Sequence, residues 1–241
     1  MIPRSRADVE KAKKALKEFE GIRYDHDHEG VLHSKDPYIS LISLARNKRM
    51  SPLELYNQNG NDYNITFSKL EIINKELHQY KKQKGLIDYI DMLEKFLDKG
   101  ESPKFEVIFI DEAQDLSLIQ WDIIKKLEKN SKQSIIAGDD DQAIYEWNGA
   151  DVIFFQTFPG KIKILKESRR LNKKVHFFSK CILNGMVGHR VEKEFTSNSK
   201  DGEIYKWSTL KKIPWKMEGS WMVLARINDV KKELQDEARK L

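Results

Sequence analysis

Two clusters of acidic and amide side chains each follow a short apolar run, and both could take part in phosphate chemistry. The first cluster is residues 111–115 (DEAQD), directly after residues 107–110 (VIFI). Open α/β sheets bind ligands at the carboxyl ends of their strands. Asp111 could hold Mg²⁺, usually through water, while Glu112 could orient or deprotonate an attacking water and Gln114 could sense a terminal phosphate. Taken alone, the cluster is equally compatible with a row of surface acids at a strand end.

The second cluster, residues 137–151 (AGDDDQAIYEWNGAD), also begins at the end of an apolar run. Its three consecutive acids repel one another, which favours a functional role over surface filler. Gln142 could reach a phosphate, and the rings of Tyr145 and Trp147 could stack on nucleic-acid bases. The alternative interpretation is that both rings are buried in a loop, which is commoner when such residues stand alone.

Together the two clusters resemble motifs of the UvrD, Rep and PcrA family of ATP-dependent DNA helicases. Residues 111–115 are similar to the Walker B motif of that family, and residues 138–151 to its next helicase motif. Further segments resemble family motifs in the same order: residues 85–93 (GLIDYIDML), Gln120, residues 165–171 (LKESRRL) and residues 223–228 (VLARIN). The first 84 residues resemble only the helical insertion of the first motor domain.

The resemblance implies a motor of two RecA-like domains that bind ATP between them. Asp111 would bind Mg²⁺, Glu112 would be the catalytic base, and Gln114 and Gln142 would couple phosphate to domain closure. Arg170, from the second domain, would contact the γ-phosphate as an arginine finger does. The resemblance assigns contacts with single-stranded DNA to four residues: Tyr145, Trp147, Asn148 and Arg226.

The sequence also departs from the family pattern. It contains no G-x-x-x-x-G-K-[ST] segment, so the backbone amides and the lysine that cradle the phosphates are missing. The later motifs of the family, including a second arginine finger, are absent as well. Asn148 stands where the family has an arginine, and Arg169 where it has an aromatic residue. The chain by itself is therefore expected to be inactive in ATP hydrolysis.

The pattern of apolar residues predicts an α/β fold with a largely parallel, RecA-like sheet and a helical N-terminal section. We expect a helical insertion-type subdomain over residues 1–84, part of a first motor domain over 85–160 and the start of a second over 161–241. Helical spacing favours helices over residues 9–19, 39–46, 67–80, 86–97 and 118–127, and a further helix through Val175, Phe178 and Ile182. Residues 57–64, which are rich in Asn and Gly, favour a polar loop. Strands are expected at residues 107–110, 134–138, 162–165, 204–207 and 222–225, the first two buried on both faces.

Charge is unevenly distributed along the 241 residues. Residues 105–160 hold eleven acids and four bases, whereas residues 161–180 hold eight bases and one acid. This pattern indicates either solvated surface or an acidic metal-nucleotide site beside a phosphate-binding face.

Cys181 is the single cysteine, which excludes an intramolecular disulfide, and its apolar neighbours favour a core position. No apolar run has the length of a membrane span and none resembles a secretory signal, so an intracellular, cytoplasmic protein without a membrane partner is expected.

Residues 25–36 imitate the oxygen spacing of a calcium-binding EF-hand loop, but a simple polar loop is the favoured interpretation.

For the whole chain, the favoured function is the central part of an ATP-dependent DNA helicase of the UvrD type, with ATP and Mg²⁺ as cofactors and single-stranded DNA as partner. One alternative is a non-catalytic DNA-binding or regulatory protein derived from such a helicase. Another is one half of a split helicase, in which a second chain brings the missing parts.

Overall fold

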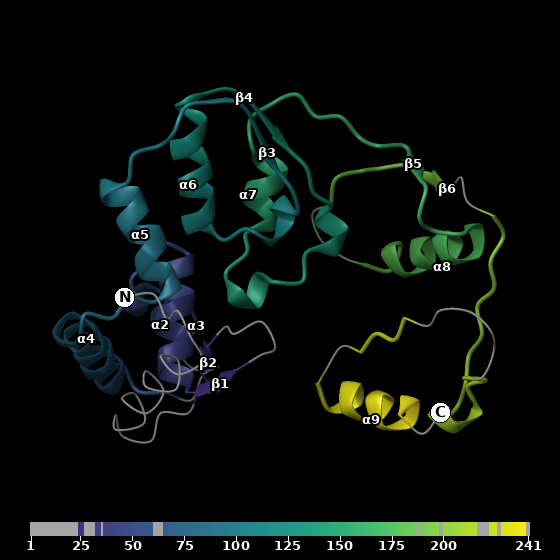
Figure 1. Cartoon of the computed structure of the whole chain (residues 1–241), viewed down its shortest axis with the longest axis horizontal. Coiled ribbons are helices and arrows are strands. Elements are labelled where there is room, and N and C mark those ends of the chain that lie inside the picture. Colours follow the sequence, from purple (N-terminus) through teal and green to yellow (C-terminus); the bar gives the residue numbers. More distant parts are fainter. Residues whose placement is uncertain are drawn as a thin grey trace. The chain divides into compact units, whose positions relative to one another are not determined.

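The computed structural model divides the chain into two compact units (Figure 1). The first unit consists of Met1–Lys161 and Gly188–Val191, and the second of Ile162–Val187 and Glu192–Leu241. The structure describes residues 24–26, 32–34, 36–59, 65–186, 188, 190–197, 200–215, 222–225 and 228–239.

Three two-stranded sheets are present in the described part of the chain. In the first unit, β1 (Tyr24–His26) pairs antiparallel with β2 (Leu32–Ser34), and β3 (Phe105–Ile110) pairs parallel with β4 (Ser131–Ile136). In the second unit, β5 (Glu167–Ser168) pairs parallel with β6 (Thr196–Ser197). Parallel pairing of the two apolar runs, as predicted from the sequence, is therefore confirmed, and the helix between them forms the crossover.

The predicted helices within the described residues are confirmed to within a few residues, whereas the helices Pro52–Asn59, Val152–Thr157 and Asn228–Ala238 were not predicted. None of the described helices combines the length and apolarity that a membrane span needs. Those of the first unit are α2 (Pro37–Asn47), α3 (Pro52–Asn59), α4 (Phe67–Lys84), α5 (Tyr89–Lys99), α6 (Leu118–Glu128) and α7 (Val152–Thr157). The second unit has α8 (Lys173–Leu183) and α9 (Asn228–Ala238). Single 3-10 turns are η2 (Ala113–Asp115), η3 (Asp140–Gln142), η4 (Glu146–Asn148) and η5 (Leu210–Lys212).

Side-chain caps fix where several of these helices begin and end. Asp36 accepts hydrogen bonds from the first amides of α2, and Ser117 and Gln120 form a capping box at the start of α6. Gly85 ends α4 in the left-handed conformation, with φ of 62°. Local sequence thus specifies the helix boundaries closely, which explains why they could be predicted.

Two hydrophobic clusters form the core of the first unit. One lies among the N-terminal helices and is built from Leu41, Ile42, Ala45, Leu55, Ile65 and Leu70. The other packs α6 and α7 against the sheet around Trp121, whose ring stacks on Phe158 with 5.0 Å between ring centroids. The second cluster lies directly beneath the carboxyl ends of β3 and β4, because Ala113, Ile110 and Ile136 belong to it.

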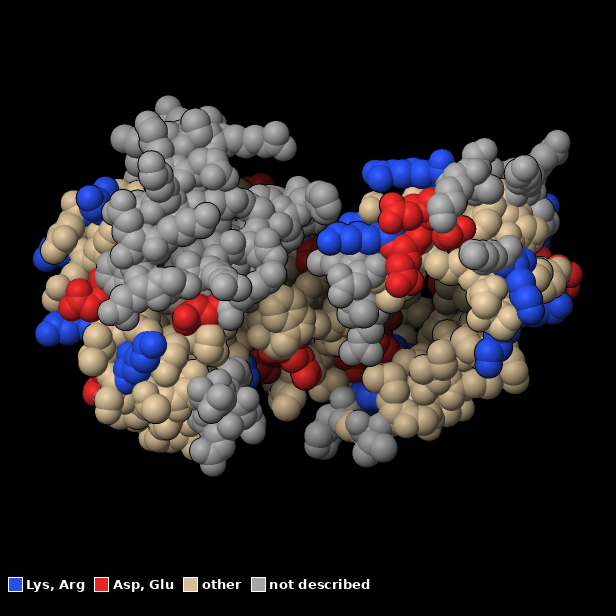
Figure 2. All heavy atoms as spheres, turned by 90° about the horizontal axis from the view of Figure 1, so that it is seen from below, with Lys and Arg blue, Asp and Glu red and all other residues tan. Residues whose placement is uncertain are grey.

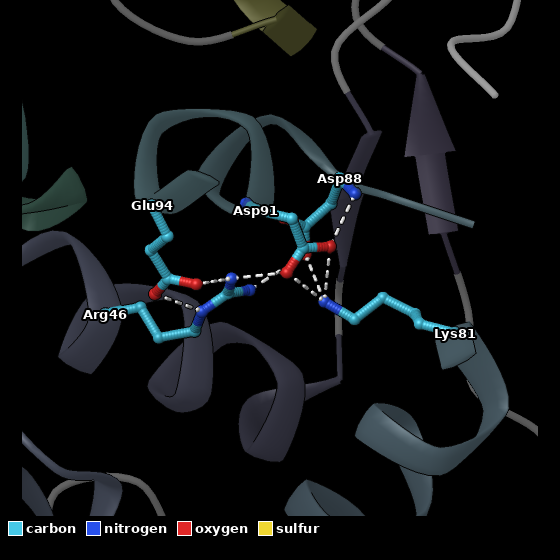
Figure 3. A network of polar contacts seen from close by, with 5 residues as sticks. All are labelled: Arg46, Lys81, Asp88, Asp91 and Glu94. Atoms are coloured by element: carbon cyan, nitrogen blue, oxygen red, sulfur yellow. Dashed lines mark hydrogen bonds and ion pairs between the residues drawn. The ribbon is translucent and has the colours of Figure 1, made fainter. Parts of the chain in front are cut away.

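A network of charged side chains joins α2, α4 and α5 (Figure 3). Arg46 of α2 forms ion pairs with Asp88 at 2.9 Å, Asp91 at 2.6 Å and Glu94 at 2.7 Å. Lys81 of α4 contacts the same two aspartates, at 2.9 and 2.8 Å. The side chains of Arg46, Lys81 and Asp91 are 16%, 14% and 17% exposed, whereas those of Asp88 and Glu94 are 43% and 38% exposed. The centre of the network is therefore shielded from solvent, and its contacts connect α5 to both helices.

The prediction that strand 107–110 is buried on both faces is wrong. Phe105, Val107 and Phe109 are 39%, 39% and 74% exposed, and Ile135 on β4 is 41% exposed. Alternate residues of a strand point to opposite faces, so these side chains share one face of the sheet. Helices α6 and α7 cover the other face, and no described element covers this one.

Several predictions for the second unit are also wrong. Residues 162–165, 204–207 and 222–225 form no strand, and Cys181 on α8 is exposed rather than buried. The reason is the scarcity of packing partners, because Leu234 is the one buried apolar side chain among the described residues of this unit. Without a layer to pack against, apolar runs gain nothing from strand formation.

Two N-terminal predictions lie partly or wholly outside the described residues. The predicted helix over 9–19 is outside them, as are residues 60–64 of the predicted loop, whereas α3 extends to Asn59. Of the calcium-loop imitation, residues 24–26 and 32–34 form an antiparallel pair, and the last acid, Asp36, caps α2. That capping role occupies an oxygen that calcium would need.

We predict that Asp91 makes the stability of the first unit depend on acid pH. Burial alone would raise the pKa of Asp91, but hydrogen bonds from Lys81 and the Asp88 amide, with the charges of Lys81 and Arg46, lower the pKa from 3.8 to about 2. A carboxylate with a depressed pKa stabilises the fold above its ordinary pKa, and this contribution disappears as the pH falls toward 2.

The Asp91→Asn variant should therefore lose about 2 kcal/mol of unfolding free energy at neutral pH, and the difference from wild type should shrink between about pH 4 and pH 2. Urea denaturation across this range measures it. Asp98→Asn, an exposed position of the same helix, is the control and should match wild type. A pH-independent loss for Asp91→Asn would contradict the electrostatic explanation.

Candidate functional site

The two acidic clusters meet at one edge of the β3–β4 sheet. Ile110 and Ile136 are register partners at the ends of the two strands. Pairing continues beyond them, because the Ala137 amide donates to the Ile110 carbonyl at 2.8 Å and the Ala113 amide donates to the Ala137 carbonyl at 3.0 Å. The loops that follow the strands are therefore held side by side by backbone hydrogen bonds.

Gln114 connects the two loops through its side-chain amide. The side chain is buried, with 1% exposure. Its Nε2 donates to Glu112 Oε2 at 2.7 Å, and its Oε1 accepts from the Asp139 amide at 2.9 Å. Because a buried amide left without partners is costly, both bonds are strongly favoured and fix Glu112 relative to the second loop.

Glu112 adopts an unusual backbone conformation for a residue other than glycine. Its φ is 51° and its ψ 41°, in the left-handed region. This conformation costs about 1–3 kcal/mol and persists where the surroundings determine it, often at functional sites. Here the Glu112 amide donates to Asp111 Oδ1 at 3.0 Å, and the carboxylate is held by Gln114. Both carboxylates are exposed.

Asp111 and Glu112 fit the requirements of a magnesium site. Mg²⁺ prefers carboxylate oxygens and retains several waters, so it needs exposed carboxylates rather than a closed protein cage. Both side chains are exposed. Asp111 Oδ2 and Glu112 Oε1 accept no hydrogen bond from any described residue, which leaves them available to a metal-bound water or to a metal. Asp115, behind them, is less suited, because burial and the neighbouring Glu112 raise its pKa.

The three consecutive acids of the second loop are neutralised or hydrogen-bonded by groups of the protein itself. Asp139 accepts from Gln142 Nε2 at 2.6 Å, and Asp140 from Gln156 Nε2 at 2.8 Å and the Val191 amide at 2.7 Å. Asp141 forms a two-point ion pair with Arg190, with 2.9 Å between Nη2 and Oδ2. Their mutual repulsion is thus offset locally, and Asp140 and Asp141 have structural roles that the sequence interpretation missed.

The aromatic pair lies on an exposed turn beyond these acids. Tyr145 is 42% exposed and Trp147 is 62% exposed, and their ring centroids are 6.3 Å apart with 47° between the planes. The turn η4 is closed by the Asn148 amide, which donates to the Tyr145 carbonyl at 2.9 Å. The alternative of buried rings is therefore excluded.

The remaining predicted site residues have separate outcomes. Asn148 is exposed and its carbonyl accepts from Asn47 Nδ2 at 3.0 Å. Arg170 belongs to the second unit and is exposed. Arg226 lies outside the described residues. Asn47 and Arg190 contact the site from 101 and 49 residues away along the chain, so no local signal in the sequence could have identified them.

Comparisons with known proteins identify relatives of this chain. A family model described as the UvrD/REP helicase N-terminal domain matches residues 4–163. The ATP-dependent DNA helicase Rep of Buchnera aphidicola subsp. Baizongia pistaciae is 25% identical over an alignment of 188 residues that covers 66% of this chain and 28% of that protein. DNA helicase II of Escherichia coli strain K12 is 32% identical over 133 residues, covering 49% of this chain and 18% of that protein.

A further relative is the RecBCD enzyme subunit RecB of Buchnera aphidicola subsp. Acyrthosiphon pisum. It is 36% identical over 104 residues, which cover 37% of this chain and 9% of that protein. The chain therefore spans between 9% and 28% of the length of these three relatives.

We predict that Gly138 is required by the contact between the two loops. A Cβ at this position would lie 2.6 Å from Gln114 Oε1, 2.8 Å from Phe155 Cζ and 3.2 Å from the Ala113 amide nitrogen. Gly138→Ala should lower the free energy of unfolding by about 1–3 kcal/mol, because a backbone atom is among the clashing groups. Gly160→Ala is the matched control, since no atom lies within 4 Å of its Cβ position. Equal unfolding midpoints for the two variants would overturn this account.

Proposed function

Because the chain belongs to the UvrD/REP helicase N-terminal domain family, we propose that it is the central part of an ATP-dependent DNA helicase and translocase of the UvrD type. In this proposal a RecA-like pair of motor domains couples ATP hydrolysis to movement along single-stranded DNA. The observation that supports it best is the hydrogen-bonded junction of the two motifs at the ends of β3 and β4. This junction joins the residues proposed for hydrolysis to the loop that precedes the aromatic turn.

A chain of three hydrogen bonds connects Gln142 to Glu112 within the proposed nucleotide site. Gln142 donates to Asp139, the Asp139 amide donates to Gln114, and Gln114 donates to Glu112. Displacement of the exposed Gln142 by a phosphate would therefore shift the carboxylate at the far end of the chain. We assign Gln114 and Gln142 the role of coupling phosphate binding to the position of Glu112.

Glu112 is the proposed base, and Asp111 the proposed Mg²⁺ ligand. Bound MgATP would supply the phosphoanhydride bond whose cleavage drives the motor. Glu112 Oε2 is occupied by Gln114, so Oε1 would orient the attacking water and accept its proton. Arg170, from the second unit, is proposed to stabilise the γ-phosphate charge when the domains close.

The partner proposed for the exposed turn is single-stranded DNA. Stacking on the rings of Tyr145 and Trp147 is independent of base identity, as a translocating motor requires. Asn148, next to Trp147, and Arg226 are proposed as polar contacts of the same strand. The basic residues of segment 161–180 add favourable electrostatics for a polyanion.

A split enzyme is the second candidate, and it would account for the exposed face of the β3–β4 sheet. Phe105, Val107, Phe109 and Ile135 form an uncovered apolar surface among the described residues. Apolar faces of parallel sheets are normally covered on both sides, so additional structure from the same or another polypeptide is expected there. A non-catalytic DNA-binding role is the third candidate. The observation that supports it is that the sequence contains no phosphate-binding loop.

The first prediction from this proposal concerns ATP hydrolysis by the chain alone. We expect no turnover above background, because no backbone loop and lysine in the sequence cradle the phosphates. Phosphate release should be measured with and without single-stranded DNA. Robust release that Glu112→Gln abolishes would show that this expectation is wrong and that the nucleotide site is already complete.

The second prediction concerns DNA binding. The chain should bind a fluorescein-labelled single-stranded oligonucleotide, with an affinity that falls steeply as salt rises. Trp147→Ala should weaken binding by about 1–3 kcal/mol, the usual contribution of one stacked base. Phe109→Ala is the control, since this aromatic side chain is 74% exposed on the sheet face. Absence of binding at low salt, or equal losses in both variants, would contradict the assignment of the turn.

A further inference from the structure

The aromatic turn cannot bind a nucleic acid through its own charges. Between Ala137 and Asp151 the sequence has five acids and no lysine or arginine. A strand stacked on Tyr145 and Trp147 would place its phosphates near these acids, and the repulsion would oppose the stacking energy. A cation from another part of the fold is therefore needed beside the turn.

The structure brings the end of α2 against this turn. Asn47 Nδ2 donates to the Asn148 carbonyl at 3.0 Å. A Cβ built on Gly149 would lie 2.8 Å from Asn47 Cβ and 3.7 Å from Lys48 Cγ. Gly149 itself has φ of 97°, a backbone conformation that only glycine adopts readily. The residue at this position must therefore be a glycine both for its conformation and for the short distance to the helix end. The stem of Lys48 is thus in contact range of the turn that carries Trp147.

Of the cations in this region, Lys48 is the one without an ion-pair partner among the described residues. Arg46 is held by three carboxylates of the network in Figure 3. Arg49 pairs with Asp122 at 3.0 Å, and Arg190 with Asp141. On the face drawn in Figure 2, the coloured lysines and arginines lie in separate small groups.

We propose that Lys48 binds a backbone phosphate of the single strand that stacks on Tyr145 and Trp147. This assignment rests on the proposed function and adds a residue from α2 to its DNA-binding surface. A lysine is a point charge on a flexible stem, and such a group binds phosphate without reading sequence. The hydrogen bond from Asn47 positions the turn against the helix end, so that ring and charge contact neighbouring parts of one strand.

The test compares Lys48→Ala with two variants of the full chain. Lys48→Arg keeps the charge, and Lys132→Ala removes a different exposed lysine, on β4, whose partner is Glu106 at 2.8 Å. Fluorescence anisotropy with labelled oligo(dT) and with a mixed-sequence strand gives the dissociation constants at several salt concentrations. Circular dichroism and urea denaturation establish that each variant is folded.

Loss of one phosphate contact should reduce the slope of log K against log salt by about 0.7 and weaken binding about eightfold near 50 mM salt, equally for both strands. Lys48→Arg and Lys132→Ala should keep the wild-type slope. If the wild type and Trp147→Ala behave as proposed while Lys48→Ala binds like the wild type, the assignment of Lys48 is wrong and the function stands. If Lys132→Ala weakens DNA binding as much as Lys48→Ala does, the loss of affinity reflects the net charge of the protein and the assignment of Lys48 is likewise wrong. If the wild type does not bind at all, the DNA-binding function itself is contradicted.

Discussion

The buried side-chain amide of Gln114 is the interaction on which the candidate site depends. It is the one group that bonds both the carboxylate after β3 and the backbone after β4. Its requirements explain several neighbouring features, including the glycine at position 138 and the left-handed backbone of Glu112. A glutamine suits this place because its amide donates at one atom and accepts at the other, which neither glutamate nor lysine can do at neutral pH.

The three consecutive acids of the second loop are bound by groups of the first unit before any ligand binds. Arg190 neutralises Asp141, while amide donors satisfy Asp139 and Asp140. The two acidic clusters, which are similar in composition, thus differ in their surroundings: Asp111 and Glu112 are exposed, whereas the three aspartates of the second loop bond to groups of their own unit and lie close enough together to share a cation.

Much of the local structure could be predicted from the sequence, because its causes are local. The start of α6 follows from Ser117 and Gln120, and the end of α4 from Gly85. The parallel pairing of β3 and β4 followed from the two apolar runs and the helix that connects them. The roles of Arg190 and Asn47 could not be predicted, since each depends on a contact far away in sequence. The exposure of Phe109 and Cys181 was missed because hydrophobicity predicts burial only where a covering layer exists.

Gly188–Val191 belong to the first unit, whereas the residues on both sides of them belong to the second. The polypeptide therefore passes between the units three times. The short segment Gly188–Val191 is held in the first unit by two contacts: Arg190 pairs with Asp141, and the Val191 amide donates to Asp140. Cleavage of the chain near Gly160 would therefore separate the acidic loop from the arginine that pairs with it, because Asp141 would remain in the N-terminal piece and Arg190 in the C-terminal piece.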